Sequence, residues 1–361
     1  MIKIGVIGCG YWGPKLIRDF YELPQAVVTI VSDLSQDRLN TINRLYRTIL
    51  TTQDYQQVLD SDVDAVCIAT PASTHYKLVR EALLAGKNVL VEKPLTTSSV
   101  QALELCLLAE QLNLILMVGH TFEYNPAVNK MRELIQSGEL GDIYYIDSAR
   151  LNLGLFRPDT NVLWDLAPHD FSIVSYLLNG AEPHSVTARG AAHIIPGVHD
   201  VVFSELAFPK NVLANIHVSW LDPCKVRRTT VVGSKKMAVF NDVSEAEKIR
   251  VYHKNVTMPQ EDGAGKFRDF SPSYLDGDIT IPRVASGEPL NIECQHLVDC
   301  VMSGEQPRSN GWVGLKVVKM LETADKALHN HFMAIPVPTE VVSADTVTKN
   351  HSLLLSNVAA S

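Results

Sequence analysis

The sequence lacks the long apolar run that a membrane-spanning helix requires. Hydrophobic residues make up 46% of the 361 positions, but they are spread along the chain, and no run approaches the roughly 20 residues needed to cross a bilayer. Residues 1–8 alternate as in a strand and reach glycine too early for the apolar core of a secretory signal. We therefore expect a cytoplasmic protein of about two domains.

Paired cysteines and an excess of positive charge are also missing. The six cysteines stand apart, without the CxxC spacing of a zinc site or the density of a disulfide scaffold, so we expect reduced thiols and no metal. Lys and Arg total 32 against 40 Asp and Glu, which gives a net charge of -8. Because such a chain repels a nucleic-acid backbone, we expect neither nucleic acid nor membrane as a partner.

The first 120 residues alternate short β-branched runs with amphipathic stretches, which is typical of a parallel sheet with helices between its strands. We expect residues 1–120 to form an α/β domain, a doubly wound Rossmann fold that binds NAD(P). The predicted strands are 2–7, 27–32, 65–69, 88–92 and 114–119, and the predicted helices are 14–21, 38–46, 75–85 and 97–112.

Beyond residue 120 the pattern changes to that of an α+β domain, which we expect over residues 121–338 for substrate binding and oligomerisation. Its strands are predicted at 143–151, 185–193, 201–208, 212–220 and 226–232, in a largely antiparallel, open-faced sheet. Helices are predicted at 126–137, 168–178, 292–303 and 313–329. We expect residues 261–288 to form a long surface excursion and the tail at 339–361 to be partly disordered.

A glycine-rich segment follows the first predicted strand. GCGYWG at residues 8–13 fits G-x-G-x-x-G, in which the glycines let the backbone approach a pyrophosphate at a helix N-terminus. Asp33 ends the next strand, where a carboxylate binds ribose hydroxyls and repels a ribose phosphate, so NAD is favoured over NADP. Arg38 weakens that preference, and a glycine turn followed by an N-capping Asp33 is the alternative. The predicted cofactor-binding residues here are Gly8, Gly10, Tyr11, Trp12, Gly13 and Asp33.

Two more polar segments end predicted strands at the carboxyl edge of the parallel sheet, where ligands of such sheets bind. They are ATPASTH at 69–75 and EKP at 92–94. A lysine at this edge can hold a substrate hydroxyl and stabilise developing oxyanion charge, and an exposed surface lysine is the alternative. The predicted cofactor-binding residues of these segments are Thr70, Pro71, His75, Glu92 and Lys93.

A fourth segment, DLAPH at 165–169, follows GCGYWG, ATPASTH and EKP along the chain. The order and spacing of these four motifs are those of a known family. In them the sequence resembles the Gfo/Idh/MocA oxidoreductases, the family of glucose-fructose oxidoreductase and inositol dehydrogenase, up to about residue 335. The resemblance implies hydride transfer between a nicotinamide and a hydroxyl or keto carbon of a sugar, nucleotide sugar or cyclitol. It also implies that Lys93 is the active-site lysine, Asp165 orients the substrate and His169 transfers the proton.

The resemblance further implies a homodimer or homotetramer formed through the open sheet of the second domain, whose apolar strands need covering. Two other functions stay open. Some relatives retain NAD and use it transiently to cleave glycosides, and a non-catalytic regulator that binds a nucleotide or sugar would use the same fold.

The DLAPH segment also has a local interpretation. Pro168 suits the first turn of a helix, and this would place His169 near the positive end, where a neutral imidazole able to accept a hydroxyl proton is favoured. If the helix extends back to Asp165, the two side chains four positions apart share a face. If Asp165 is the N-cap instead, its role is structural.

Residues 155–164, LFRPDTNVLW, stand where many relatives are glycine-rich, and we expect them to roof the substrate site. Arg157 suits a carboxylate or phosphate on an anionic sugar or nucleotide sugar, and an ion pair with Asp159 is the alternative. His120, Tyr124 and Asn125 match family positions near cofactor and substrate, although each could equally serve packing. The predicted substrate-binding residues are His120, Tyr124, Asn125, Arg157, Asn161, Asp165 and His169.

Overall fold

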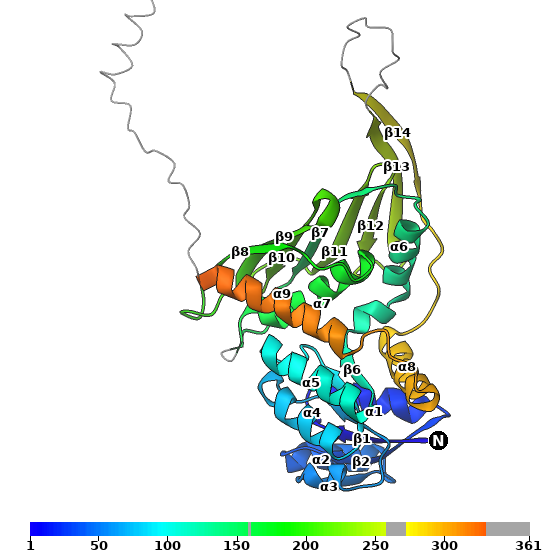
Figure 1. Ribbon diagram of the computed structural model, residues 1–361, viewed down its shortest axis with the longest axis vertical. Helices are drawn as coiled ribbons and strands as arrows, with labels where there is room; N and C mark the ends of the chain where they lie inside the picture. The colour runs from blue at the N-terminus through cyan, green and yellow to red at the C-terminus, as the bar shows by residue number, and fades with distance from the viewer. Residues whose placement is uncertain (158–159, 258–271, 330–361) are drawn as a thin grey trace, which may run out of the picture. The chain divides into compact units, whose positions relative to one another are not determined.

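The computed structural model describes residues 1–157, 160–257 and 272–329, and residues 1–329 cluster as one compact unit (Figure 1). The N-terminal strands form a six-stranded parallel sheet in the order β3-β2-β1-β4-β5-β6. This is the strand order of dinucleotide-binding doubly wound folds. The strands are β1 (Ile2–Ile7), β2 (Ala26–Ser32), β3 (Leu50–Thr52), β4 (Ala65–Ile68), β5 (Asn88–Glu92) and β6 (Leu116–Gly119).

The helices of this part lie between the strands, which confirms the predicted alternation. All four residues of β4 are buried, as expected of a parallel strand covered on both faces. The short elements β3 and α3 were not predicted, because three or four residues carry too little periodicity. The helices are α1 (Gly13–Glu22), α2 (Gln36–Leu45), α3 (Gln56–Leu59), α4 (His75–Leu84) and α5 (Ser99–Leu112), with the short 3-10 turns η1 (Ala72–Thr74) and η2 (Thr121–Tyr124).

The second sheet has eight strands in the order β14-β13-β12-β11-β7-β10-β9-β8. Its neighbouring strands are antiparallel except β7 and β10, which confirms the largely antiparallel sheet. The strands are β7 (Ile143–Leu151), β8 (Ser185–Ala191), β9 (Val201–Phe208), β10 (Val212–Ser219), β11 (Val226–Gly233), β12 (Met237–Asn241), β13 (Ile249–Thr257) and β14 (Ser273–Thr280); a short turn, η3 (Pro209–Asn211), joins β9 to β10.

Strands β12, β13 and β14 extend this sheet beyond the prediction. β14 falls within residues 261–288, which were expected to be a surface excursion, so that expectation is wrong for this stretch. Every residue of β14 is exposed, which explains why it shows no buried alternation in the sequence. Residues 258–271 and the tail at 339–361 lie outside the described residues.

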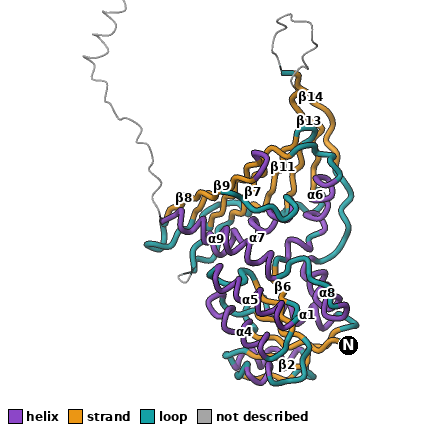
Figure 2. Tube along the Cα trace, viewed as in Figure 1, coloured by secondary structure: helices purple, strands orange, loops and turns teal. Residues whose placement is uncertain are grey.

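Helices cover one face of the second sheet and leave the other face open (Figure 2). The helices concerned are α6 (Pro126–Gln136), α7 (Val162–Leu177) and α9 (Gly311–His329). Residues of β7 alternate accordingly: Ile146 and Ser148 are fully buried on the helical side, whereas Tyr145 is 46% exposed. In the described part of the chain, no helix combines the length and apolarity needed to cross a membrane.

Helix α8 (Pro289–Ser303) returns to the first sheet. Leu290, Cys294 and Leu297 share an apolar core with Ile4 and Phe20, and α8 contacts α1 and β1. The C-terminal end of the chain therefore completes the core of the N-terminal sheet. Helix α8 also contacts η2, and the division of the chain into residues 1–120 and 121–338 stays a prediction.

Candidate active site

The loop between β1 and α1 has the shape that a diphosphate needs. Gly8 has a φ of +100°, and a Cβ on it would lie 2.7 Å from the Ala69 carbonyl oxygen; one on Gly13 would lie 2.0 Å from the Gly8 oxygen. Both positions therefore exclude a side chain, whereas a Cβ on Gly10 meets nothing within 4 Å. Helix α1 starts at Gly13 without a side-chain cap. Pro14 has no N–H, and the N–H groups of Lys15 and Leu16 donate to the Trp12 carbonyl oxygen, so an anion here would meet the positive end of the helix and the N–H of Gly13.

Asp33 is fixed at the end of β2 beside this loop. Its carboxylate accepts hydrogen bonds from the backbone N–H of Cys9, at 2.6 Å, and of Ser35, at 2.8 Å. The N-cap of α2 is Ser35, so the alternative in which Asp33 caps that helix is wrong. Arg38 lies 3.5 Å from the Asp33 carboxylate. These residues fit the adenosine end of a dinucleotide, with Asp33 as the acceptor for ribose hydroxyls.

Tyr11 and Trp12 project from the same loop. Tyr11 is 72% exposed, and the Lys15 ammonium lies 3.7 Å from the centre of its ring and 4.4 Å from that of Trp12. The described residues therefore leave the Tyr11 ring largely uncovered at the edge of the cofactor loop.

His75 connects the other two predicted cofactor segments. Its ring nitrogens lie 2.8 Å from the Pro94 carbonyl oxygen and 2.9 Å from that of Thr70. Burial lowers the pKa of His75, although both carbonyl contacts oppose that effect. The histidine is 1% exposed, so it holds the two loops together, whereas Thr70 and Pro71 lie at the accessible edge of the sheet.

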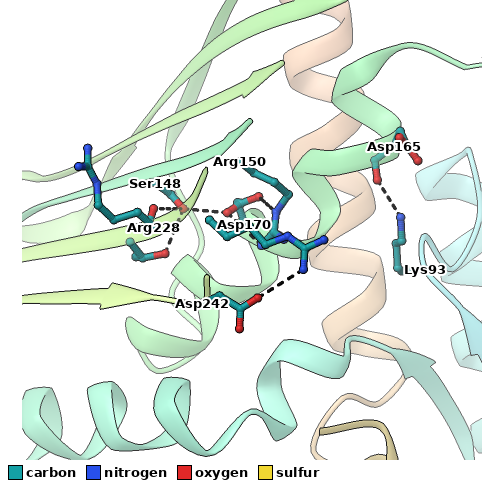
Figure 3. Close-up of polar contacts among 9 residues, drawn as sticks. Lys93, Ser148, Arg150, Asp165, Asp170, Arg228 and Asp242 are labelled. Carbon is teal, nitrogen blue, oxygen red and sulfur yellow. Dashed lines mark hydrogen bonds and ion pairs between the residues drawn. The ribbon is translucent and has the colours of Figure 1, made fainter. Parts of the chain in front are cut away.

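Lys93 reaches from the end of β5 to helix α7 (Figure 3). Its Nζ donates a hydrogen bond to the Asp165 carbonyl oxygen at 2.7 Å, and the Lys93–Pro94 peptide bond is cis. Burial lowers the pKa of the ammonium, against the charges of Asp165 and Glu92, which raise it. Burial also raises the pKa of Glu92 to about 7.

Helix α7 begins six residues earlier than predicted. Asn161 is its N-cap, and the Asn161 side chain accepts a hydrogen bond from Trp164 N–H at 3.1 Å. Pro168 therefore lies inside the helix, and the expectation that Pro168 opens the helix is wrong, as is the alternative that Asp165 caps it. Asp165 and His169 are both helical and four residues apart, so their side chains share one face.

His169 is neutral for a different reason from the one expected. It is the eighth residue of α7, too far along for the helix N-terminus to act on it. Burial lowers its pKa well below the usual 6.5, and the charges of Lys93 and Arg150 add to this effect. The ring packs edge-on against Phe122, with centres 5.2 Å apart, and its Nδ1 is buried without a hydrogen-bond partner in the described part of the chain.

A buried ion pair joins strand β7 to helix α7 (Figure 3). The Nε of Arg150 on β7 donates to the carboxylate of Asp170 on α7 at 2.6 Å, and Ser148 donates to the same carboxylate at 2.8 Å. Arg150 also lies 4.5 Å from the centre of the Phe122 ring. This pair connects the second sheet to the face of α7 that carries the site, and the sequence analysis did not identify it.

The structure separates the predicted substrate residues into two groups. His120 is buried next to Lys93, and burial lowers its pKa to about 3. Tyr124 instead lies in the core, 3.0 Å from the Ser309 hydroxyl, and Asn125 caps α6 by accepting from Ala127 N–H at 2.9 Å. Asn161 caps α7 and donates to the Asp325 carboxylate at 3.0 Å. The packing alternative therefore fits Tyr124 and Asn125.

Arg157 belongs to the segment 155–164, and its side chain is exposed. Its charge lowers the pKa of Lys93. Asp159, its possible ion-pair partner, lies outside the described residues. Trp220, which donates to the Asp165 carboxylate, was missed because one tryptophan after a strand gives no local signal. Among the described residues, no group of three or more His, Cys, Asp and Glu side chains is placed to hold a metal ion.

Comparisons with known proteins agree with this geometry. The oxidoreductase family GFO_IDH_MocA, with an NAD-binding Rossmann fold, matches residues 2–120, and the GFO/IDH/MocA C-terminal domain matches residues 128–239. The UDP-N-acetylglucosamine 3-dehydrogenase of Acidithiobacillus ferrooxidans is 28% identical over 262 residues, which are 72% of this chain and 79% of that protein. The scyllo-inositol 2-dehydrogenase (NAD(+)) of Bacillus subtilis is 25% identical over 319 residues, 85% of this chain and 88% of that protein.

A solved structure from Magnetospirillum magnetotacticum MS-1 is 29% identical, with a TM-score of 0.75, and covers 90% of this chain and 99% of that chain. The two family matches together span more than half of the sequence and cover both sheets. The chain therefore belongs to the Gfo/Idh/MocA family of NAD-binding oxidoreductases.

Proposed function

We propose that this protein is an NAD-dependent dehydrogenase that oxidises a CH–OH group of a sugar, nucleotide sugar or cyclitol, or reduces the matching ketone. The observation that carries the proposal is the meeting of Lys93 with Asp165 and His169 of α7, next to a loop shaped for a dinucleotide. The bound nicotinamide supplies the hydride acceptor. The named dehydrogenases among the relatives support the same reaction class.

The residue roles follow from charge and position. Lys93 uses one hydrogen to bind the Asp165 carbonyl, so its ammonium has two more to donate to the reacting oxygen and to stabilise charge there. His169, neutral near pH 7 because its pKa is well below 6.5, accepts the hydroxyl proton as the C–H hydride leaves. Asp165 accepts a substrate hydroxyl and sets the orientation of the ring.

The proposed cofactor contacts are the predicted ones at the edge of the first sheet, with His75 and Glu92 supporting the loops from beneath. We assign Asp33 to the adenosine ribose, which favours NAD over NADP because its carboxylate repels a 2'-phosphate. On the substrate side we retain His120 and Arg157. The exposed Arg157 guanidinium supports a substrate that carries a carboxylate or phosphate.

The two other functions considered from the sequence gain no support. The relatives named above are dehydrogenases, which favours neither a glycoside-cleaving enzyme nor a regulator. A regulator would also have no use for a lysine, an aspartate and a histidine placed together at a nicotinamide site.

We further infer that a second copy of the chain covers the open face of the second sheet, giving a homodimer or homotetramer. On that face the side chains of Tyr145, Phe203 and Leu213 are 46%, 49% and 43% exposed. Strands β7 and β10 line a hollow of about 750 Å³ there, to which Tyr145 and Leu213 contribute. Exposed apolar surface of this kind marks an interface. Six unpaired cysteines support a cytoplasmic location, where thiols stay reduced.

The test of the proposed function is nicotinamide absorbance with purified protein, NAD and a panel of nucleotide sugars, uronates, free sugars and cyclitols. We expect one compound to be oxidised and Lys93→Ala to lower kcat by about 10³-fold, the scale of losing a group that stabilises developing charge. NAD affinity, measured by calorimetry, should change far less than kcat, because the loop at Gly8–Gly13 and Asp33 are untouched and still hold the cofactor. Near-normal turnover by Lys93→Ala would exclude the assigned role.

A further inference from the structure

Trp220 directs its indole N–H at the Asp165 carboxylate. Nε1 lies 3.0 Å from Oδ2 of Asp165, and Trp220 is 1% exposed, which makes it one of the largest fully buried side chains. A buried indole N–H needs an acceptor, so the carboxylate and the tryptophan fix each other. The described residues provide no hydrogen bond to the other carboxylate oxygen, Oδ1, which leaves it available to a substrate hydroxyl.

The segment that follows β7 packs against the same indole. Gly154 N–H donates to the Trp220 carbonyl oxygen at 2.9 Å, and a Cβ on Gly154 would lie 2.7 Å from Cδ1 of the indole. The Phe156 ring meets the indole edge-on, with centres 5.5 Å apart. Trp220 is therefore held between residues 154–156 and helix α7.

Asp165 thus receives two hydrogen bonds from different parts of the molecule. Lys93 of the first sheet binds its backbone carbonyl, and Trp220 of the second sheet binds its carboxylate. The first contact leaves the carboxylate free to rotate about its side-chain bonds, whereas the second selects one rotamer. A small displacement of an orienting group lowers the rate strongly because the reacting atoms need a narrow geometry.

We propose that Trp220 is a positioning residue for the reaction: it holds the Asp165 carboxylate in the orientation that receives the substrate and connects that orientation to residues 154–156. This inference rests on the proposed dehydrogenase function. It predicts that a change in residues 154–156 alters the orientation of the Asp165 carboxylate by displacing the Trp220 indole.

The test begins with Trp220→Phe, which removes the N–H but keeps an aromatic ring. We expect kcat, measured with the panel compound that the wild type oxidises fastest, to fall about 10- to 100-fold, the range for a misplaced orienting group. The KM for NAD should stay unchanged. Trp312→Phe is the matched control, because the Trp312 indole also donates to a carboxylate, that of Glu110 at 2.6 Å, but on the surface between α9 and α5; its kcat should equal that of the wild type.

A double-mutant cycle separates positioning from packing. If Trp220 acts through Asp165, Trp220→Phe should lower kcat by no more than about twofold when it is added to Asp165→Ala, since Asp165→Ala removes the acceptor and Trp220→Phe removes the donor of the same hydrogen bond. Equal losses in the two backgrounds would show that the tryptophan only fills space and would overturn the proposal.

Gly154→Ala provides a second route that keeps the tryptophan, because the new methyl group must displace the indole. It should lower kcat in the wild-type background but not in Asp165→Ala, and it serves in the same cycle if Trp220→Phe does not fold. An active wild type with unchanged Trp220→Phe and Gly154→Ala variants overturns this inference alone. A wild type that oxidises no compound in the panel overturns the proposed function, and this inference with it.

Discussion

Glu123 carries a carboxyl group buried beneath the site. Its side chain accepts a hydrogen bond from the Ser172 hydroxyl at 2.6 Å, and burial raises its pKa to about 7, against the opposing charges of Arg308 and Arg132. Below pH 4.5 the carboxyl is protonated in both the folded and the unfolded chain, so it adds no cost. Between pH 4.5 and about 7 the unfolded chain has lost the proton while the folded chain keeps it, so the folded state becomes less stable as the pH rises; above about 7 both have lost it and the destabilisation stays constant.

Glu123→Gln removes this pH-dependent cost. A pKa difference between 4.5 and about 7, at about 1.4 kcal/mol for each unit, lets the variant gain up to about 3 kcal/mol over the wild type in the free energy of unfolding between pH 4.5 and pH 8. Urea unfolding at both pH values measures it. Glu133→Gln on the exposed side of α6 is the control, and a gain for Glu123→Gln that does not change with pH would contradict the burial of a charge.

At the scale of single residues, the sequence pointed to the side chains that lie in motifs but not to the buried side chains that hold the surrounding structure in place. Lys93, Asp165 and His169 could be singled out because each lies in a short motif with a fixed spacing. The structure places Lys93 in hydrogen-bond contact with the helix that carries the other two, and their roles stay a proposal. Glu123 and Trp220 were not found, because their burial depends on contacts with segments 49 and 55 residues away in the chain. His169 was assigned the right protonation state from a helix end that lies elsewhere; the low pKa comes from burial and neighbouring cations.

Among the elements, α7 shows where sequence patterns fail. Its proline suggested a helix start, yet Pro168 occupies the seventh position of the helix, and the start is set by Asn161. The cap was hard to recognise because Asn161 follows a proline, an aspartate and a threonine that read as loop. Strands β1, β5, β7 and β9 have the bounds that the sequence predicted.

Asn161→Ala tests the start of this helix. The side chain both caps Trp164 N–H and binds Asp325 of α9, so its removal should cost about 1–2 kcal/mol and lower Tm by about 1–3 °C in a chain of this length. Ser98→Ala is the matched control, since Ser98 is the N-cap of α5 without a side-chain hydrogen bond. Differential scanning fluorimetry of both variants decides: equal Tm values would show that Asn161 does not stabilise α7.

On the scale of the whole molecule, the sequence predicted two sheets and their classes but not how the end of the chain is used. Periodicity predicted α8 and α9 as helices, but the sequence of neither helix indicates which sheet it packs against. Helix α8 packs with Phe20 in the core of the first sheet. Helix α9 contributes to both cores: Leu315 and Val318 lie with Leu95, whereas Val317 and Leu321 lie with residues of the second sheet.

Leu213→Arg tests the inferred association of two copies. Leu213 lies beside Tyr145 on the open face, so a charge there would be buried without a partner in a dimer, at a cost of several kcal/mol. We expect the mass measured by sedimentation equilibrium to fall to that of one chain, with the far-ultraviolet circular dichroism unchanged. Leu103→Arg on α5, where the leucine is similarly exposed at 40%, is the control. An unchanged mass for Leu213→Arg would place any interface elsewhere.

The return of α8 to the first sheet has a consequence for biosynthesis. A ribosome finishes β1 through β6 long before it reaches residue 289. The apolar side of α1 and β1 that α8 covers therefore stays uncovered while residues 120–288 are synthesised. Chains emerge at roughly 5–20 residues per second, which makes this wait on the order of ten seconds or more. During that time the nascent NAD-binding half exposes a surface that chaperones recognise, and a transcript cut before α8 would yield a protein prone to aggregation even though every cofactor motif is present.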